Sequence, residues 1–212
     1  MTVVLLHGFT GSPAELRLLA RALNAQGFGV EAPLLAGHGT RLEDLMEIEP
    51  RQWLEQIDAL VLRLRNQGQR VVVAGLSLGS ILALQAGLRH PEIEAVMAYS
   101  PPIISGDPRT LIAPLLARVF SSVARPAEDY VDPATAERIW TYGRWPSRCS
   151  VRVLGLIRAT RRQLAELQQP LLVVASRKDR VITERGVEWL KRRTGSRLSL
   201  IHISEPTRRT II

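Results

Sequence analysis

A single serine stands between two glycines in the segment Val71–Ser80, which reads VVVAGLSLGS. The β-branched run Val71–Val73 precedes it, and an apolar stretch that favours a helix begins at Ile81. This pattern predicts a strand, a tight turn with Ser77 at its apex, and a helix. In such a turn the Ser Oγ projects from the carboxyl edge of a parallel sheet, where it can attack an acyl carbon. We therefore take Ser77 as the candidate nucleophile.

The glycines around this serine are expected to have a steric role. A side chain at Gly75 or Gly79 would collide with the neighbouring strand or helix in so tight a turn. The helix that starts behind Ser77 would also direct N–H groups and a partial positive charge at a developing oxyanion. A serine in such a turn can instead act only as a helix cap, so the catalytic interpretation needs an oxyanion hole, an acid and a base.

The loop His7–Gly11, which reads HGFTG, follows a short apolar run and precedes a helix. In sites with this kind of serine turn, one N–H of this loop and the N–H after the nucleophile form the oxyanion hole. The pattern nominates Phe9 and Leu78, both through their main chains. We interpret His7 as a structural residue that holds the loop. We expect no metal or organic cofactor, since the sequence has no HExxH motif, paired cysteines or phosphate-binding glycine loop.

Asp179 is the candidate acid, because it follows the buried-type strand Leu171–Ala175 at the sheet edge where catalytic groups gather. A carboxylate there can orient an imidazole, although an aspartate in such a loop is often only a helix cap. His202 is the only histidine after Asp179, and period-two alternation places it inside a strand-like run. His38 precedes the nucleophile, against the order Ser, Asp, His, and is interpreted as a residue that organises its loop.

The elements that must position these residues alternate between strand and helix, which predicts one α/β domain, residues 1–212, with a mainly parallel sheet flanked by helices. The expected strands are Thr2–Leu6, Gly29–Pro33, Arg70–Ala74, Ile93–Ser100, Leu171–Ala175 and Arg197–Ile203. A capping box of Ser12 and Glu15 predicts the start of one helix, and Thr40 and Glu43 have the same spacing. Further helices are expected over Pro50–Asn66, with Trp53 in the core, from the serine turn to about Leu88, and over Glu184–Arg193.

Pro101 and Pro102 interrupt this alternation, and no strong strand is expected from Ile103 to about Gln169. The patterns there indicate helices over Thr110–Ser122, Pro133–Tyr142 and Cys149–Leu167. We expect residues 101–169 to form a small helical cap. It would either cover the serine turn as a lid or consist of packing helices without a role in recognition.

Composition limits the function classes. The 212 residues are 46% hydrophobic, enough for one sizeable core, and no apolar run approaches the ~20 residues that span a bilayer. The net charge of +8 comes mostly from residues 191–212, which hold six Lys or Arg and one Glu, and few aromatics accompany it. We therefore expect no nucleic-acid partner. Cys149 is the only cysteine and no signal peptide is recognisable, so a cytoplasmic location is expected.

From Val3 to Arg193 the chain resembles small bacterial carboxylesterases of the α/β-hydrolase fold, which are relatives of monoacylglycerol lipases. The resemblance rests on HGFTGSPAEL, PLLAGHGT, AGLSLGS and the Asp179 loop. It implies a serine esterase that acts through an acyl-enzyme on short- to medium-chain esters or monoglycerides. In that reading Ser77 is the nucleophile, Asp179 the acid, and Phe9 and Leu78 the oxyanion hole. The alternative is a catalytically silent ligand-binding or regulatory protein of the same fold.

The chain departs from this resemblance at the base. Those relatives carry the catalytic histidine in a loop after the last strand, whereas His202 lies within the strand-like run. The run Leu198–Arg209, LSLIHISEPTRR, resembles the peptide obtained when sequencing-adapter DNA is translated. We therefore expect residues 198–212 to be a non-native tail, and the natural protein to continue differently after about Arg197 with its own catalytic histidine.

Overall fold

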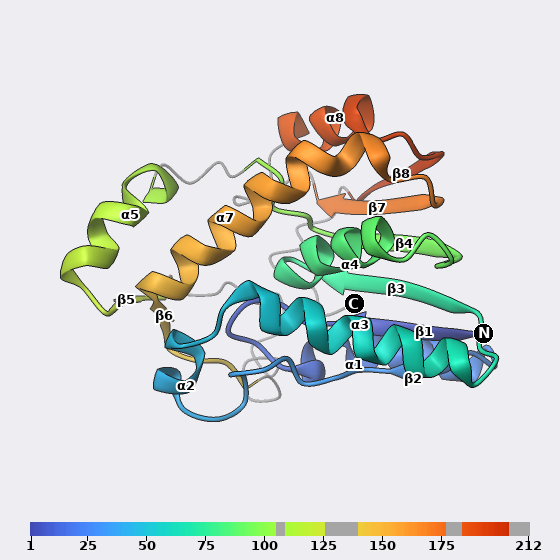
Figure 1. Ribbon diagram of the computed structural model, residues 1–212, viewed down its shortest axis with the longest axis horizontal. Coiled ribbons are helices and arrows are strands. Elements are labelled where there is room, and N and C mark those ends of the chain that lie inside the picture. Colours follow the sequence, from blue (N-terminus) through green and yellow to red (C-terminus); the bar gives the residue numbers. More distant parts are fainter. Residues whose placement is uncertain (105–108, 126–139, 177–183, 204–212) are drawn as a thin grey trace.

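The computed structural model describes residues 1–104, 109–125, 140–176 and 184–203. Its centre is a six-stranded sheet in which every neighbouring pair is parallel, in the order β2-β1-β3-β4-β7-β8 (Figure 1). The strands are β1 (Thr2–Leu6), β2 (Gly29–Glu31), β3 (Val71–Leu76), β4 (Ala95–Tyr99), β7 (Leu171–Ser176) and β8 (Leu198–Ile203). The predicted α/β fold with a mainly parallel sheet is confirmed, and each predicted strand of this sheet is present.

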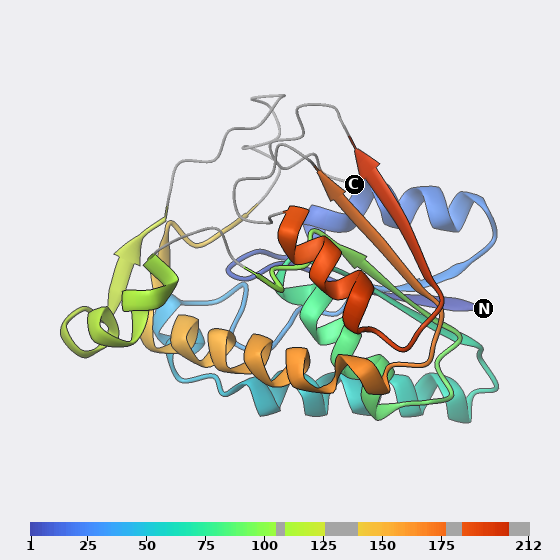
Figure 2. The ribbon, with the colours of Figure 1, turned by 90° about the horizontal axis from the view of Figure 1, so that it is seen from above.

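Helices cover both faces of the sheet (Figure 2). Apart from α5 (Arg109–Val119), the helices of the described ranges are α1 (Arg17–Ala25), α2 (Leu42–Met46), α3 (Pro50–Asn66), α4 (Leu78–Arg89), α7 (Ser147–Gln163) and α8 (Glu184–Arg193), with the 3₁₀ turns η1 (Pro13–Leu16) and η2 (Leu164–Glu166). One face packs against α3, α4, α7 and α8, and the other packs against η1 and α1. None of the helices in the described ranges is long and apolar enough to cross a membrane.

The larger core lies between the sheet and the α3–α4–α7 layer. Helix α4 is apolar on nearly all sides and buries every residue from Leu78 to Gly87, as expected for a helix between a sheet and other helices. Trp53 of α3 is fully buried, as predicted, and its indole N–H donates to the carbonyl of Ala36 at 2.9 Å. This core fixes the start of α4, and therefore the turn that carries Ser77.

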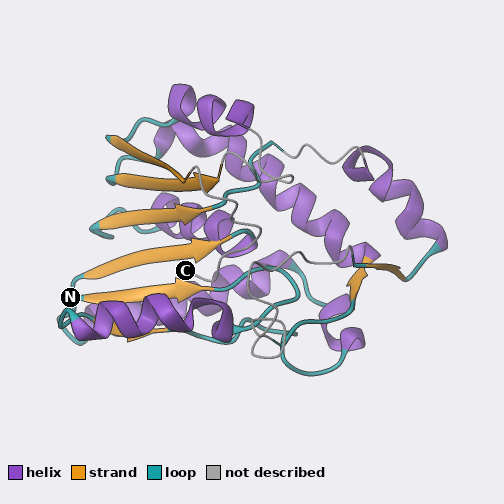
Figure 3. Cartoon of the chain, turned by 180° about the vertical axis from the view of Figure 1, so that it is seen from behind, coloured by secondary structure: helices purple, strands orange, loops and turns teal. Residues whose placement is uncertain are grey.

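Helix α7 packs against the sheet, whereas the segment between β4 and α7 projects beyond the carboxyl ends of the strands (Figure 3). It contains α5 (Arg109–Val119), which exposes Leu111 and Val119 by 80% and 73%. The sequence predicted no strong strand in this segment, and its described residues form one short antiparallel pair, β5 (Ser122–Ala124) and β6 (Arg144–Pro146). The helix expected over Pro133–Tyr142 lies mostly outside the described residues, and its last three positions, which are described, are not helical.

Two predicted capping boxes form differently. Ser12 makes no side-chain cap, because the chain opens with a 3₁₀ turn and the carboxylate of Glu15 accepts the N–H of Gly8 at 2.8 Å instead. The second box is displaced by one residue from Thr40 and Glu43, so that the N–H of Arg41 donates to Asp44 at 3.2 Å. For Glu15, the contact with the N–H of Gly8 therefore replaces the local capping box with Ser12.

Candidate active site

Ser77 occupies the turn between β3 and α4 with a backbone conformation of φ 53° and ψ −114°. A positive φ in a non-glycine residue costs on the order of 1–3 kcal/mol and persists only where the surroundings enforce it. Here the N–H of Ser77 donates to the carbonyl of Tyr99 at 2.9 Å. Its own carbonyl accepts the N–H of Ser80 at 3.0 Å and the Ser80 hydroxyl at 2.5 Å. The turn is therefore held on both sides of the serine.

The flanking glycines have the steric role that the sequence predicted. A Cβ on Gly75 would lie 2.0 Å from the carbonyl oxygen of Gly79, which belongs to α4. A Cβ on Gly79 would lie 2.0 Å from the carbonyl oxygen of Leu6, at the end of β1. Both distances are far below van der Waals contact with backbone atoms that cannot move aside, so each position requires glycine.

The His7–Gly11 loop lies beside Ser77, since a Cβ on Gly8 would be only 3.7 Å from the Ser77 Cβ. The carbonyl of Gly8 accepts the Gly11 N–H at 3.1 Å and lies 3.0 Å from Nδ1 of His7. This carbonyl shares a planar trans peptide with the N–H of Phe9, and the two groups point in opposite directions. Holding the carbonyl therefore sets the direction of the Phe9 N–H.

Both histidines near this loop are buried and neutral. Nε2 of His7 accepts the N–H of Leu35 at 3.0 Å, and Nε2 of His38 accepts the N–H of Thr10 at 3.2 Å. The proton of each ring is therefore on Nδ1, which faces the Gly8 carbonyl in His7 and the Ala36 carbonyl, at 3.2 Å, in His38. Burial lowers the pKa of His7 to about 3 and that of His38 to about 4.

These contacts confirm the structural interpretation of both rings. Each imidazole has its two nitrogens engaged with backbone groups, so neither offers a free acceptor to a serine hydroxyl. The rings also pack edge to face, with centroids 4.8 Å apart. His7 and His38 thus join the His7–Gly11 loop to the loop that contains Leu35 and Ala36.

Of the predicted acid and the candidate base, the structure describes only the backbone of the second. Asp179 lies outside the described residues, in the segment that follows β7. The backbone of His202 lies in β8, paired in register with Ala175 of β7, so it is near the carboxyl edge of the sheet. Between β8 and β3 stand β7 and β4. Three strand spacings amount to about 14 Å, which is more than a histidine and a serine side chain span together.

The sequence pattern of the family described as "Serine aminopeptidase, S33" matches residues 1–207. The chain belongs to this family. The solved structure of a metagenome-derived lipolytic enzyme, from a study of LipS and LipT, superposes on this S33-family chain with a TM-score of 0.87 and 23% identity, over 96% of this chain and 83% of the other. Monoacylglycerol lipase from Paleococcus ferrophilus gives a TM-score of 0.80 at 20% identity, over 96% and 84%. These likenesses establish the α/β-hydrolase fold.

Two curated relatives of the S33-family chain have names that describe an activity. A thermostable monoacylglycerol lipase from Bacillus sp. (strain H-257) is 29% identical over 185 residues, which cover 85% of this chain and 71% of the relative. A carboxylesterase from Bacillus subtilis (strain 168) is 28% identical over 183 residues, which cover 85% and 72%.

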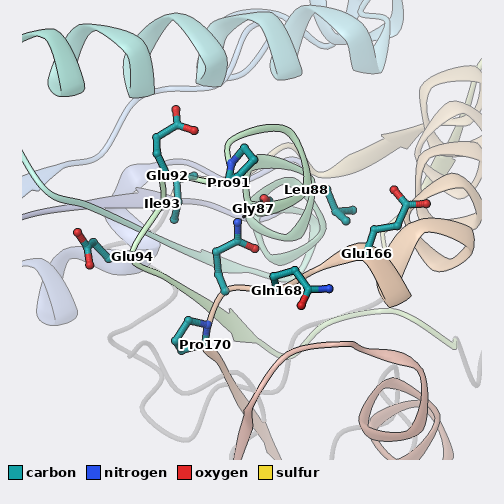
Figure 4. A pocket seen from close by; sticks show the side chains of 10 residues that line it. Gly87, Leu88, Pro91, Glu92, Ile93, Glu94, Glu166, Gln168 and Pro170 are labelled. Atoms are coloured by element: carbon teal, nitrogen blue, oxygen red, sulfur yellow. Dashed lines mark hydrogen bonds between the residues drawn. The ribbon is translucent and has the colours of Figure 1, made fainter.

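A hollow of about 390 Å³ in the S33-family chain is shown in Figure 4. Its lining residues lie at the amino ends of the strands, whereas Ser77 follows the carboxyl end of β3. The lining includes Glu92 and Glu94 before β4, and Glu166 and Pro170 before β7. The three glutamate side chains point in different directions rather than toward one centre (Figure 4). Within the described ranges no group of three His, Cys, Asp or Glu residues is arranged to hold a metal ion.

Sequence reasoning missed the roles of three residues that support the S33-family site. Glu15 holds the N–H of Gly8, Ser80 holds the carbonyl of Ser77, and Tyr142 donates its N–H to the carbonyl of Thr10 at 3.0 Å. The serine at position 80 directly follows the glycine of the turn and could have been proposed from the sequence. Tyr142 carries no local signal, because its partners are distant in the chain.

Proposed function

We propose that this protein is a serine carboxylester hydrolase that acts through an acyl-enzyme on short- to medium-chain esters or monoglycerides. The observation that carries the proposal is the enforced positive φ of Ser77 beside a loop whose Phe9 N–H has a fixed direction. The names of the two Bacillus relatives support the ester substrate class. The exposed leucine and valine side chains of α5 are also consistent with apolar substrates.

In the proposed first half-reaction, a histidine accepts the Ser77 hydroxyl proton while Oγ bonds to the ester carbonyl carbon. The carbonyl oxygen becomes an oxyanion that accepts the N–H groups of Phe9 and Leu78. Leu78 is the first residue of α4, so its N–H has no acceptor within the helix. The C–O bond then breaks, and the alcohol leaves with the proton held by the histidine. Asp179 would keep the imidazole oriented and stabilise its charged form.

In the second half-reaction, water gives a proton to the histidine and its oxygen attacks the acyl carbon. The Ser77–acyl bond breaks, the proton returns to Ser77 Oγ, and the carboxylic acid is released. No step requires a metal or an organic cofactor. Each oxyanion-hole donor in such sites is worth roughly 10²–10³ in rate, so the hole is a major part of the proposed catalysis.

The sheet order bears on which histidine can serve as the base. While His202 stays in β8 it is about three strand spacings from the Ser77 turn, roughly 14 Å. A histidine that serves Ser77 has to reach it from a loop beyond the strand ends. This supports the expectation that the catalytic histidine of the natural protein is a different residue, supplied by a segment that differs from residues 198–212.

Hydrolysis of p-nitrophenyl butyrate by the wild type, Ser77→Ala and His202→Ala tests the proposal. We expect activity that disappears in Ser77→Ala and changes less than twofold in His202→Ala. Loss in both variants would establish His202 as the base. An inactive wild type should regain activity when a relative's last loop and histidine replace residues 198–212. A folded chimaera that binds esters without hydrolysing them would indicate a silent binding protein, and hydrolysis of leucine p-nitroanilide alone would indicate a peptidase.

A further inference from the structure

Tyr142 bonds to two loops, the His7–Gly11 loop and the loop between β2 and α2. Its backbone N–H donates to the carbonyl of Thr10 at 3.0 Å. Its hydroxyl oxygen lies 2.9 Å from the carbonyl of Arg41 and 3.0 Å from that of Gly37, and it accepts the N–H of Thr40 at 3.2 Å. The side chain is only 7% exposed. A tyrosine two residues before β6 of the projecting segment is thus fixed to the body of the protein by both main chain and side chain.

The bond to Thr10 continues toward the candidate oxyanion hole. The Thr10 carbonyl shares a peptide unit with the N–H of Gly11, and that N–H donates to the carbonyl of Gly8 at 3.1 Å. The Gly8 carbonyl in turn shares a peptide unit with the N–H of Phe9. Two hydrogen bonds and two planar peptides therefore lead from the Tyr142 N–H to the Phe9 N–H. Hydrogen bonds in such a chain polarise one another, which makes the terminal N–H a better donor.

Thr10 itself shows that this path is under constraint. Its φ of +63° is unusual for a β-branched residue, and the surroundings must impose it. The N–H of Thr10 is held by His38 and its carbonyl by Tyr142. Without the Tyr142 contact, one of these two restraints is lost.

We propose that Tyr142 is a positioning residue for the oxyanion hole. It starts the peptide chain that directs the Phe9 N–H, and its hydroxyl keeps it in place to do so. The projecting segment is therefore coupled to the reaction. The catalytic meaning of this inference rests on the proposed function, because it requires Phe9 to be an oxyanion donor.

Tyr142→Phe and Tyr99→Phe form a matched pair that tests the inference. Both tyrosines are 7% exposed, and each variant loses only a hydroxyl. Tyr99 accepts the Ser77 N–H through its main-chain carbonyl, which phenylalanine keeps, whereas its hydroxyl has a methionine sulfur, Met97 Sδ at 3.8 Å, as its partner. We expect amide hydrogen exchange at residues 8–11 to rise about tenfold in Tyr142→Phe and to stay unchanged in Tyr99→Phe. The NMR chemical shifts of the Phe9 and Gly11 amide protons, measured at 10 °C, complement the exchange experiment, because they report on the folded molecules alone.

A catalytic readout separates positioning from plain stability. With p-nitrophenyl butyrate, kcat per titrated active site should fall about tenfold in Tyr142→Phe, with KM changed less than twofold. Butylboronic acid adds to a serine hydroxyl without turnover, and its Kd should rise about tenfold in the same variant. The inference would be overturned if Tyr142→Phe lowered only the number of active sites found by titration, with kcat and the boronate Kd unchanged. Unchanged exchange at residues 8–11 would also overturn it. A wild type that has no esterase activity, and gains none when a relative's last loop and histidine replace residues 198–212, would contradict the proposed function, while exchange and boronate binding would still decide the role of Tyr142.

Discussion

The N–H of Leu35 donates to Nε2 of His7 at 3.0 Å, which leaves the ring proton on Nδ1, beside the carbonyl of Gly8. One imidazole therefore links two loops that are 28 positions apart in the chain. His38 repeats the arrangement between Thr10 and Ala36. Both links exist only while the imidazoles are neutral, because protonation of Nε2 removes the acceptor.

Stability should therefore depend on pH through these two residues. The unfolded chain protonates its histidines near 6.5, whereas the folded chain does so only near 4 for His38 and near 3 for His7. The folded-state pKa is lowered, so the contribution is complete above 6.5 and is lost as pH falls from 6.5 toward 4. Each histidine contributes a slope of up to about 1.4 kcal/mol per pH unit in that window.

Replacing His38 by Gln isolates one of these contributions. Urea unfolding of the wild type and His38→Gln at pH 7, 6 and 5 should show that the variant is less stable at pH 7 but loses less stability on acidification. The slope should be smaller by up to about 1.4 kcal/mol per pH unit. Equal slopes would show that the His38 ring is already protonated in the folded state at pH 5.

Gly79→Ala should abolish the turn around Ser77. Its Cβ would meet the carbonyl oxygen of Leu6 at 2.0 Å, so either β1 or the start of α4 has to shift. We expect esterase activity to fall at least 100-fold, because a displacement of ~1 Å at a reacting group can cost that much. Gly68→Ala is the control for added Cβ strain, since Gly68 has a positive φ of 74° but no atom within 4 Å of its Cβ position. It should keep wild-type kcat, and an active Gly79→Ala protein would contradict the steric argument.

Glu15→Ala should destabilise the protein by about 1–3 kcal/mol, because it leaves the N–H of Gly8 without its acceptor in a buried loop. Glu15→Gln keeps an acceptor oxygen and should lose less. Glu43→Ala removes an exposed carboxylate from the first turn of α2 and should change stability by no more than about 0.5 kcal/mol. Thermal and urea unfolding of the three variants measure the order of their losses in stability. An equal effect of Glu15→Ala and Glu43→Ala would mean that the Gly8 contact contributes little.

Leu64→Ala and Leu62→Ala test the rotational setting of α3 with the same substitution two residues apart. Leu64 is 3% exposed and belongs to the main core, whereas Leu62 is 50% exposed. The first variant should cost about 2–5 kcal/mol and the second less than about 1 kcal/mol. Chemical denaturation of the two variants measures both losses of stability. A larger loss in Leu62→Ala than in Leu64→Ala would mean that another face of α3 is buried.

The sequence was most informative where a pattern repeats or a turn is sterically determined. Helix α3 begins at Pro50 and ends at Asn66 as predicted, because its apolar residues recur at helical spacing between a proline and a glycine signal. The turn at Ser77 was predicted because Gly75 and Gly79 are required by close backbone approach. In both cases the determining residues are neighbours in the chain.

Contacts between distant segments were not predictable in this way. Tyr142 bonds to groups more than one hundred residues earlier, and no local pattern marks such a partner. Glu15 has the spacing of a capping box but bonds to Gly8, since the loop that returns over it offers a buried donor. The strands β5 and β6 have three residues each, which is too short for an alternating pattern to appear.

The doubly held carbonyl of Gly8 also has a kinetic consequence. A peptide whose carbonyl accepts two donors cannot rotate to a second orientation without breaking both, so the Phe9 N–H occupies one state before any ligand arrives. In the oxyanion hole proposed above, an inhibitor that becomes tetrahedral on adding to Ser77 then meets a donor that is already in place, and no fraction of the binding energy is lost to selecting a minor conformer. Association with a boronate should accordingly be a single phase, with an observed rate that rises linearly with inhibitor concentration instead of levelling off.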